Sequence, residues 1–352
     1  MRTAIDLFAG AGGATQGLRA AGFEVVAAVE SDHDAAATWR LNHPGQILER
    51  DVRLVTADDL RQAGNLQERR LDLLKACPPC QGFSSLRGST KPDQRRNDLV
   101  LDTLRLVEGL LPRAVLLENV PGLRRDDRFA TLTQGMRDLG YGLSDYLAEA
   151  SSLGVPQRRR RLVVVAIHGM DAVPATLDEL VPPVQRRPRM TAGAALTALD
   201  QRALAHDPVH VWRRSRDIVA ARIRAIPIGG TRFDLPAHLQ LACHQGLRTK
   251  AGRINRSATG SYGRVRSGEP APTMTTRCTT PACGSFIHPT EHRGLSLREA
   301  ATLQTFPVQY RWHGGYDSIE RQIGNAVPVW MAQALGDAVQ RLLDAPDAAG
   351  SD

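Results

Sequence analysis

The chain has 352 residues, of which 42% are hydrophobic and 23% are charged, a composition typical of a soluble globular protein. This length predicts one large domain and a smaller one. No apolar run approaches the roughly 18 residues of a membrane helix, which excludes a membrane-spanning protein. The opening segment MRTAID reaches an acidic residue before any apolar core develops, so no secretory signal is expected and we predict a cytoplasmic location.

Basic residues outnumber acidic ones by 45 to 37, which gives a formal net charge of +8. The predominance of arginine over lysine suits contact with phosphates or guanine edges, although basicity alone is weak evidence for a nucleic-acid partner. The five cysteines are an odd number, which argues against a disulfide framework. Cys77 and Cys80 have CxxC spacing, but no second pair of suitable spacing accompanies them, so no zinc site is expected.

The first half of the chain alternates short apolar runs with helical patterns. Strands are predicted at residues 3–7, 23–29, 71–76, 113–117 and 161–167. Helices are predicted at residues 14–21, 32–42 and 99–111, with Asp32 as the N-cap of the second. This alternation predicts an α/β fold with an open, mostly parallel sheet that is covered by helices on both faces.

The pattern changes near residue 170, and residues 191–285 are rich in arginine and glycine with little periodicity. Interleaved apolar residues favour a small folded domain with long loops over a disordered basic linker. They are Phe233, Leu235, Leu239, Ile254, Tyr262 and Val265. Helical patterns return at residues 297–305 and 327–343, and the tail after Asp344 is small and polar.

Three features near the amino terminus suit a nucleoside cofactor. The segment DLFAGAGG (6–13) lies between a strand and a helix, where glycines let a ligand approach the backbone. Glu30 ends the next strand, where a carboxylate can accept hydrogen bonds from ribose hydroxyls, and Asp51 can accept from an adenine amino group. The pyrophosphate pattern G-x-G-x-x-G does not fit, because Thr15 stands at the third glycine position.

Two further motifs follow predicted strands at the carboxyl edge of the sheet. Cys80, in CPPCQGFS (77–84), is flanked by proline and polar residues, which favours an exposed, usable thiol over a buried structural one. Glu118, in ENVP (118–121), is a candidate acid, although a helix cap or a surface residue would give the same pattern. In open α/β folds, ligands bind at this edge.

A run of four arginines follows Gln157 just ahead of the last strand of this half. Successive strand side chains point to opposite faces, so Arg159 and Arg161 are predicted on one side and Arg158 and Arg160 on the other. One pair can then face the active cleft while the other meets solvent or DNA.

In order and content, these motifs resemble the cytosine-5 DNA methyltransferase family, from Thr3 to about Leu342. The matching blocks are DLFAGAGG (6–13), Glu30, Asp51, PPCQGFS (78–84), ENV (118–120), QRRRR (157–161), REAATLQTFP (298–307) and RQIGNAVP (321–328). The resemblance implies a Rossmann-like S-adenosylmethionine-dependent domain at residues 1–188 and a smaller, irregular target-recognition domain at 189–285. It also implies a return to the large domain at 286–344 and a flexible tail at 345–352.

The resemblance implies roles for individual residues. S-adenosylmethionine would be bound by Phe8, Ala9, Gly10, Gly12, Gly13, Glu30, Asp51, Val52, Pro79, Asn325 and Val327. Cys80 would be the nucleophile, Glu118 would contact the cytosine ring, and Arg159 and Arg161 would orient the base and the catalytic loop. DNA contacts are expected from Gln81, Ser84, Arg95 and Arg96 in the loop after the nucleophile, and from Arg248, Arg253, Arg264 and Arg266 in the recognition domain. No metal is implied.

The implied chemistry is covalent catalysis on a base flipped out of the duplex. Addition of Cys80 to carbon 6 of cytosine would make carbon 5 nucleophilic. Glu118 would assist at ring nitrogen 3, which requires a carboxyl pKa above the reference value of about 4.3. Carbon 5 would then take the methyl group, and loss of its proton would release Cys80.

Two positions depart from the family pattern. Cys77 stands where glycine or another small residue is common, and Arg160 stands where an acidic residue is common. We expect neither to touch the nucleophile or Glu118.

The resemblance thus predicts a monomeric bacterial enzyme, nucleoid-associated through DNA, that methylates a short duplex sequence with or without a separate restriction endonuclease. A tRNA cytosine-5 methyltransferase of the same fold is the first alternative, although the short signature of that branch is not found. An inactive DNA-binding relative is the second, and the presence of all implied catalytic residues weighs against it. A methyltransferase for small molecules or proteins would leave Cys80 and the recognition domain unexplained.

Overall fold

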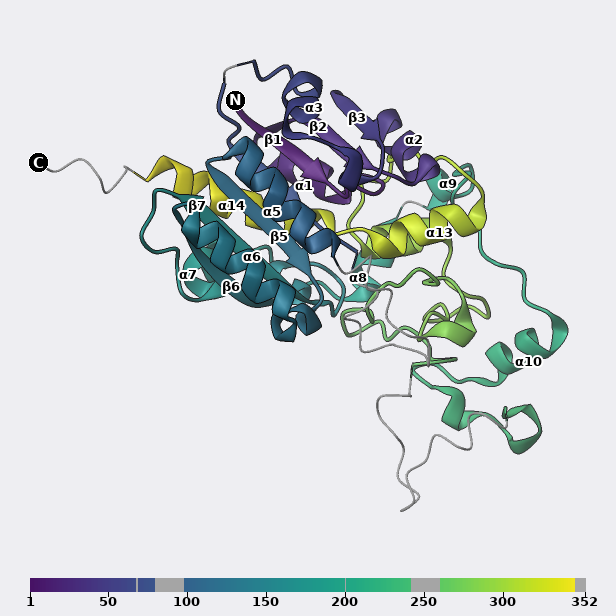
Figure 1. The fold of residues 1–352 in the computed structure, drawn as a ribbon. Coiled ribbons are helices and arrows are strands. Elements are labelled where there is room, and N and C mark those ends of the chain that lie inside the picture. The colour runs from purple at the N-terminus through teal and green to yellow at the C-terminus, as the bar shows by residue number, and fades with distance from the viewer. Residues whose placement is uncertain (68, 80–97, 200, 242–259, 346–352) are drawn as a thin grey trace, which may run out of the picture. The chain divides into compact units, whose positions relative to one another are not determined.

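The protein is described from a computed structural model that covers residues 1–67, 69–79, 98–199, 201–241 and 260–345 (Figure 1). The chain forms two compact units. The sheet unit consists of Met1–Gly154, Arg160–Pro188 and Val327–Asp352. The second unit consists of Val155–Arg159 and Arg189–Ala326.

The described residues of the sheet unit form a seven-stranded sheet in the order β3-β2-β1-β4-β5-β7-β6. The strands are β1 (Arg2–Leu7), β2 (Phe23–Glu30), β3 (Gln46–Glu49), β4 (Leu73–Ala76), β5 (Ala114–Asn119), β6 (Tyr141–Glu149) and β7 (Arg160–His168). Strands β1 to β5 are parallel, and β7 runs antiparallel to both β5 and β6. The predicted mostly parallel sheet is therefore confirmed. Strands β3 and β6 were missed, because neither alternates cleanly between buried and exposed positions.

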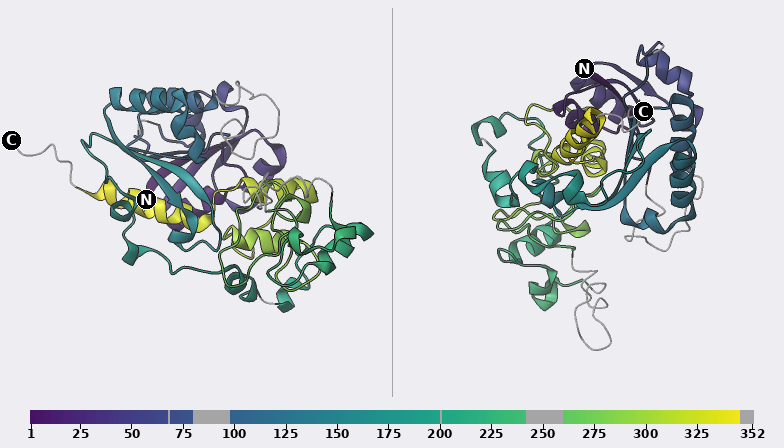
Figure 2. Two further views of the ribbon diagram at one scale, coloured as in Figure 1. Left: turned by 90° about the horizontal axis from the view of Figure 1, so that it is seen from below. Right: turned by 90° about the vertical axis from the view of Figure 1, so that its left-hand side faces the viewer.

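Helices cover both faces of this sheet, as Figures 1 and 2 show. One face carries α1 (Gly13–Ala20), α2 (His33–Asn42) and α14 (Val329–Asp344). The other carries α3 (Ala57–Ala63), α5 (Leu99–Leu110) and α6 (Asp127–Asp138), and the short α7 (Leu177–Leu180) lies beside β6. Asp32 caps α2 as expected, since its side chain accepts a hydrogen bond from the amide of Ala35.

The core of the sheet unit follows from simple periodicity. On α5, buried residues recur at helical spacing, with Leu106 and Val107 fully covered. They pack in one cluster with strand residues such as Leu74, Leu117 and Val164. Burying one such side chain contributes about 1.5–3 kcal/mol to the free energy of folding. A shift in strand register would expose these side chains, so burial fixes the register, and the strand ends meet at a common edge. In the described parts of the chain, no helix is both long and apolar enough to cross a membrane.

Helices α1 and α14 approach each other closely, which fixes the glycine turn that precedes α1. At Gly17 an added Cβ would lie 2.4 Å from the carbonyl oxygen of Val329 and 2.6 Å from Cβ of Ala332. Real Cβ atoms do not make such contacts, so this crossing requires glycine at position 17.

Gly17→Ala should therefore destabilise the protein by roughly 1–3 kcal/mol, because the helices must move apart to admit a methyl group. Urea unfolding followed by circular dichroism measures the loss. Gly268→Ala is the control, since its Cβ would meet nothing within 4 Å. Equal stability of the two variants would contradict the packing argument.

The second unit contains short helices joined by long irregular segments. They are α8 (Ala192–Thr197), α9 (Gln201–Leu204), α10 (Asp217–Ala225), α12 (Leu297–Leu303) and α13 (Tyr316–Asn325). A small core joins Ile223, Ile226, Leu235, Leu239, Tyr262 and Ile287. The apolar residues predicted to fold this region thus include three members of its core, whereas Ile254 lies outside the described residues.

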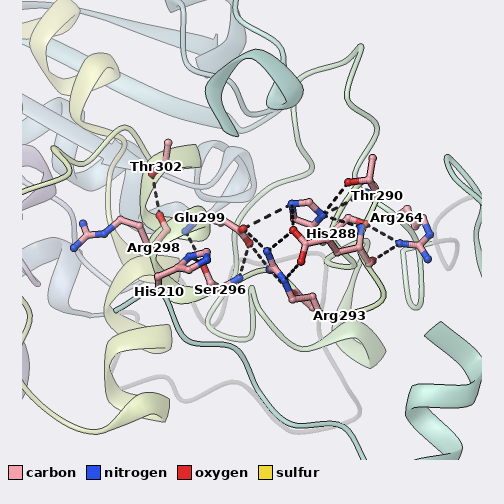
Figure 3. A network of polar contacts seen from close by, with 11 residues as sticks. His210, Arg264, His288, Thr290, Arg293, Ser296, Arg298, Glu299 and Thr302 are labelled. Atoms are coloured by element: carbon pink, nitrogen blue, oxygen red, sulfur yellow. Dashed lines mark hydrogen bonds and ion pairs between the residues drawn. The ribbon is translucent and has the colours of Figure 1, made fainter. Parts of the chain in front are cut away.

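Hydrogen bonds and ion pairs between buried polar groups also connect the segments of this unit (Figure 3). Arg293 binds Glu299 with two hydrogen bonds of 2.8 and 2.7 Å, and both residues are less than 10% exposed. Glu299 also forms a capping box with Ser296 at the start of α12. Such a bidentate pair fixes two segments where regular backbone pairing is sparse.

The unit boundaries differ from the expected domain boundaries. We expected the return to the large domain to begin at residue 286, whereas the sheet unit resumes at Val327. Helix α12 contacts α8 and α13, all of them in the second unit, which keeps residues 286–326 there. The segment Val155–Arg159 also belongs to the second unit, because Gln157 binds the backbone of Leu303 and Met274.

Candidate active site

The carboxyl edge of the sheet brings together the ends of four neighbouring strands. Leu7 pairs with Val29 on one side and with Ala76 on the other, and Ala76 pairs with Leu117. The residues that follow these positions therefore lie next to one another. The antiparallel β7 begins at the same edge, since its Leu162 pairs with Asn119 of β5.

The turn after β1 has an unusual backbone. Phe8, Gly10 and Gly12 have φ angles of 57°, 54° and 91°, all in the left-handed region. Glycine adopts this region freely, whereas a phenylalanine there is strained, and such strain clusters at functional sites. An added Cβ at Gly10 would meet nothing within 4 Å, so the turn borders open space. Ala9 is buried, and its amide donates to the carbonyl of Val29.

Glu30 fastens this turn to the end of β2. Its Oε2 accepts a 2.8 Å hydrogen bond from the amide of Gly10, and its Oε1 accepts from the amides of Ser31 and Asp32. Burial raises the pKa of Glu30, while these amides act in the opposite direction. The structure thus places a half-buried carboxylate against the glycine turn.

The other expected cofactor residues of the sheet unit are placed as follows. Asp51 pairs with Arg53, whose hydrogen bonds lower the pKa of the Asp51 carboxyl. Val52 is buried, and its carbonyl accepts from Arg105. Pro79 is half-buried after β4, and Val327 packs against Ala14 of α1. Asn325 is exposed and ends α13 in the second unit.

A buried polar network lies beneath the turn, and sequence reasoning missed it. Lys75 of β4 forms a 2.9 Å ion pair with Asp6 of β1, and both side chains are at most 3% exposed. Thr15 donates a 2.7 Å hydrogen bond to Asp6 and accepts one from the indole of Trp39. Burial alone would lower the pKa of Lys75, but the negative charges of Asp6, Cys77 and Glu118 together outweigh burial and the pKa is raised. The sequence signal for this network was Lys75 itself, a charged residue within an otherwise apolar predicted strand.

Glu118 lies near the end of β5 with 4% of its surface exposed. Its Oε1 forms a 2.9 Å ion pair with Nε of Arg161, and its Oε2 accepts a 3.0 Å hydrogen bond from Sγ of Cys77. The next residue, Asn119, donates to the carbonyl of Pro78. The expectation that Cys77 does not touch Glu118 was therefore wrong, because parallel pairing of β4 with β5 sets the two residues side by side.

The arginine run divides between the two units. Arg161 belongs to the sheet unit, whereas Arg159 belongs to the second unit, is 3% exposed and donates to the carbonyl of Met274. Arg158 and Arg160 are exposed. Exposure thus alternates along the run as strand geometry requires.

The residues expected to contact DNA are only partly described. Cys80 and the candidate DNA contacts Gln81, Ser84, Arg95, Arg96, Arg248 and Arg253 lie outside the described residues. Arg266 is more than half exposed and pairs with Glu269. Arg264 is 3% exposed and binds the carbonyls of Ile223, Ile226, His288 and Glu291, so a base-reading role does not fit it.

Breaking the buried ion pair tests its part in the site. Lys75→Met leaves the carboxylate of Asp6 buried without its counter-charge, which should cost about 3–5 kcal/mol. Arg266→Met breaks an exposed pair and should cost at most about 1 kcal/mol. Urea unfolding of both variants measures the difference, and a similar cost for the two would argue against this role of Lys75.

A strained glycine turn, a half-buried carboxylate at the next strand end and a mixed sheet define the class of S-adenosylmethionine-dependent methyltransferase folds. A solved E. coli structure, described as a candidate DNA modification methyltransferase encoded within a prophage, superposes with a TM-score of 0.68 at 27% identity, covering 98% of this chain and 100% of that one. The Dnmt2 methyltransferase of S. pombe superposes with a TM-score of 0.64 at 18% identity, over 97% of this chain and 99% of its own, and shows the fold alone.

The sequence comparisons identify the family within this class. Residues 2–341 match the family model for C-5 cytosine-specific DNA methylases. The Type II methylase M.HgiDII of Herpetosiphon aurantiacus is 31% identical over 97% of this chain and 95% of its own. The Type II methyltransferase M.PspPI of a Psychrobacter strain is 32% identical over 97% of this chain and 79% of its own. The chain belongs to the C-5 cytosine-specific DNA methylase family.

Proposed function

We propose that this protein transfers a methyl group from S-adenosylmethionine to carbon 5 of cytosine within a specific short sequence of duplex DNA. The observation that carries the proposal is the setting of Glu118. Its carboxyl is held by Arg161 at the edge where Pro78 and Pro79 lead into Cys80. Addition to a cytosine ring requires an acid and a nucleophile, and the candidate nucleophile directly follows Pro79 in the sequence.

The cofactor fits the opposite part of the same edge. Glu30 would hold the ribose hydroxyls, because its half-buried carboxylate at the end of β2 has oxygens directed to the glycine turn. Phe8, Ala9, Gly10, Gly12 and Gly13 would line the pocket, and the open space beside Gly10 admits a ligand. Asp51, Val52, Pro79, Asn325 and Val327 would complete the pocket. When bound, S-adenosylmethionine supplies an electrophilic methyl group.

The protein groups then have distinct tasks. Cys80 adds to carbon 6 of a flipped cytosine, which raises the electron density at carbon 5. Glu118 holds the ring at nitrogen 3, and Arg161 fixes Glu118 from the side. Arg159 is proposed to orient the base. After carbon 5 loses its proton, Cys80 leaves by elimination, so the thiol is regenerated in each turnover.

The second unit is proposed to recognise the DNA sequence. It carries exposed arginines, among them Arg266, that can contact phosphates or base edges. Gln81, Ser84, Arg95, Arg96, Arg248 and Arg253 are proposed as further contacts from their sequence positions alone. We expect the protein to act as a cytoplasmic monomer on bacterial DNA, with any cognate endonuclease acting separately. In the described residues, no cluster of three His, Cys, Asp or Glu side chains suits a metal ion.

Bisulfite sequencing tests the reaction and its nucleophile together. DNA from cells that express the wild-type chain should show a protected cytosine in one fixed short sequence. Cells that express Cys80→Ser should show none, because serine is a far weaker nucleophile toward carbon 6. Soluble wild-type protein without any protected cytosine would overturn the proposal, and methylation of tRNA instead would favour the related RNA activity.

Cofactor binding is tested without DNA. Glu30→Gln removes the charge and one acceptor oxygen, which should weaken S-adenosylmethionine binding roughly 10- to 100-fold, as expected for hydrogen bonds to a charged group. Isothermal titration calorimetry measures the affinity. Glu49→Gln is the matched control, because Glu49 ends the neighbouring β3 and pairs with His33 and Arg40 at the surface. An unchanged affinity in Glu30→Gln would rule out the assigned ribose contact.

A further inference from the structure

Cys77 carries a second thiol at the carboxyl edge of the sheet, and the proposed reaction assigns no role to it. It follows β4 directly, and the pairing of Ala76 with Leu117 sets it beside Glu118. Its Sγ lies 3.0 Å from Oε2 of Glu118 as a hydrogen-bond donor. The contact therefore follows from sheet register and does not depend on the conformation of a loop.

The two oxygens of Glu118 have different partners on opposite sides. Arg161 of β7 binds Oε1 through Nε, and Cys77 after β4 binds Oε2. A carboxyl held at both oxygens cannot rotate about its terminal bond without breaking one of the two contacts.

Cys77 is itself held from behind. Its side chain packs against the cluster of Ala14, Val327 and Ala332, which belongs to α1, α14 and the segment before α14. A half-buried thiol between this cluster and Glu118 has little freedom to leave the carboxylate. Lys75 is the nearby cation on β4, and Asp6 of β1 is its partner.

We propose that Cys77 is a positioning residue for methyl transfer, whose thiol, opposite Arg161, fixes the carboxyl of Glu118 toward the target cytosine. This inference rests on the proposed function. It assigns a role to the hydrogen bond donated by Cys77, and not to the bulk or the nucleophilicity of its sulfur. A residue without a donor at this position would remove the contact to Oε2 and keep the ion pair of Oε1 with Arg161.

Substitution separates the donor from the bulk. Cys77→Ala should lower kcat roughly tenfold while KM for S-adenosylmethionine and for DNA changes less than about twofold, since a lost hydrogen bond to a charged group is of that size. Cys77→Ser keeps a donor of similar size and should recover most of the loss. Ser144→Ala is the matched control, because it removes a half-buried side-chain hydroxyl on β6 that donates a hydrogen bond to the carbonyl of Val173.

The pH dependence of kcat distinguishes the two roles, because it would not change if Cys77 acted only by packing. A donor to a carboxylate stabilises its ionised form, so removal of that donor favours the protonated form. The limb of the kcat profile that reports Glu118 should therefore shift to higher pH in Cys77→Ala, whichever protonation state the reaction uses, and return in Cys77→Ser. Arg161, Lys75 and Asp6 remain in place in both variants.

The contact between Cys77 and Glu118 can also be tested by a measurement that does not need enzymatic activity. In a Cys80→Ser background, Cys77 is the cysteine of its tryptic peptide, and mass spectrometry can follow its alkylation by iodoacetamide. Glu118→Gln removes the neighbouring negative charge, so alkylation should become faster at a given pH. Equal alkylation rates with and without Glu118 would show that the contact does not form in solution and would overturn the inference.

The outcomes are distinguishable from failure of the proposed function. Wild-type protein that methylates no cytosine would overturn the proposed function. The alkylation rates would then still show whether Cys77 contacts Glu118. Wild-type activity together with an unchanged kcat and pH profile in Cys77→Ala would sink the role of Cys77 alone. A loss in Cys77→Ala that serine does not restore, or a loss confined to cofactor affinity, would assign Cys77 to packing and also overturn the inference.

Discussion

The ion pair between Asp6 and Lys75 is the contact on which the active edge depends. It crosses from β1 to β4 between residues that pair in the sheet register, and neither charge reaches solvent. A buried charge needs its partner, so the two strand ends are constrained together. Asp6 also holds Thr15 of α1, which in turn accepts from Trp39 of α2. The glycine turn between Asp6 and Thr15 is thereby fixed at both ends.

Strand direction is the second constraint on the site. Arg161 reaches Glu118 because β7 runs antiparallel to β5, which puts the first residues of β7 at the carboxyl edge. A parallel strand in that place would carry them to the opposite edge. The acid, its arginine and the Cys77 thiol therefore sit on backbone that sheet hydrogen bonds position. Rigid elements hold reacting groups more accurately than loops do.

The sheet and its carboxyl edge could be predicted from the sequence, because a strand and its end are marked by neighbouring residues: an apolar run followed by glycine, proline or an acidic residue. It did not allow lateral contacts to be predicted. The pairing of Cys77 with Glu118 depends on register between segments 41 residues apart, and Lys75 needs Asp6 from another strand. Arg264 was misjudged for a related reason, since a basic residue in an irregular stretch carries no local sign of burial.

The arginines of the second unit show why basic composition is a poor measure of DNA contact. Arg222, Arg264, Arg293 and Arg298 are each less than 10% exposed and bind carbonyl or carboxylate oxygens. An irregular chain leaves carbonyls without helix or strand partners, and a guanidinium brings five donors to them. Arginine thus replaces regular secondary structure within this unit. A count of basic residues therefore does not tell which side chains are accessible to a phosphate, whereas Arg214, Arg216, Arg224 and Arg266 are exposed.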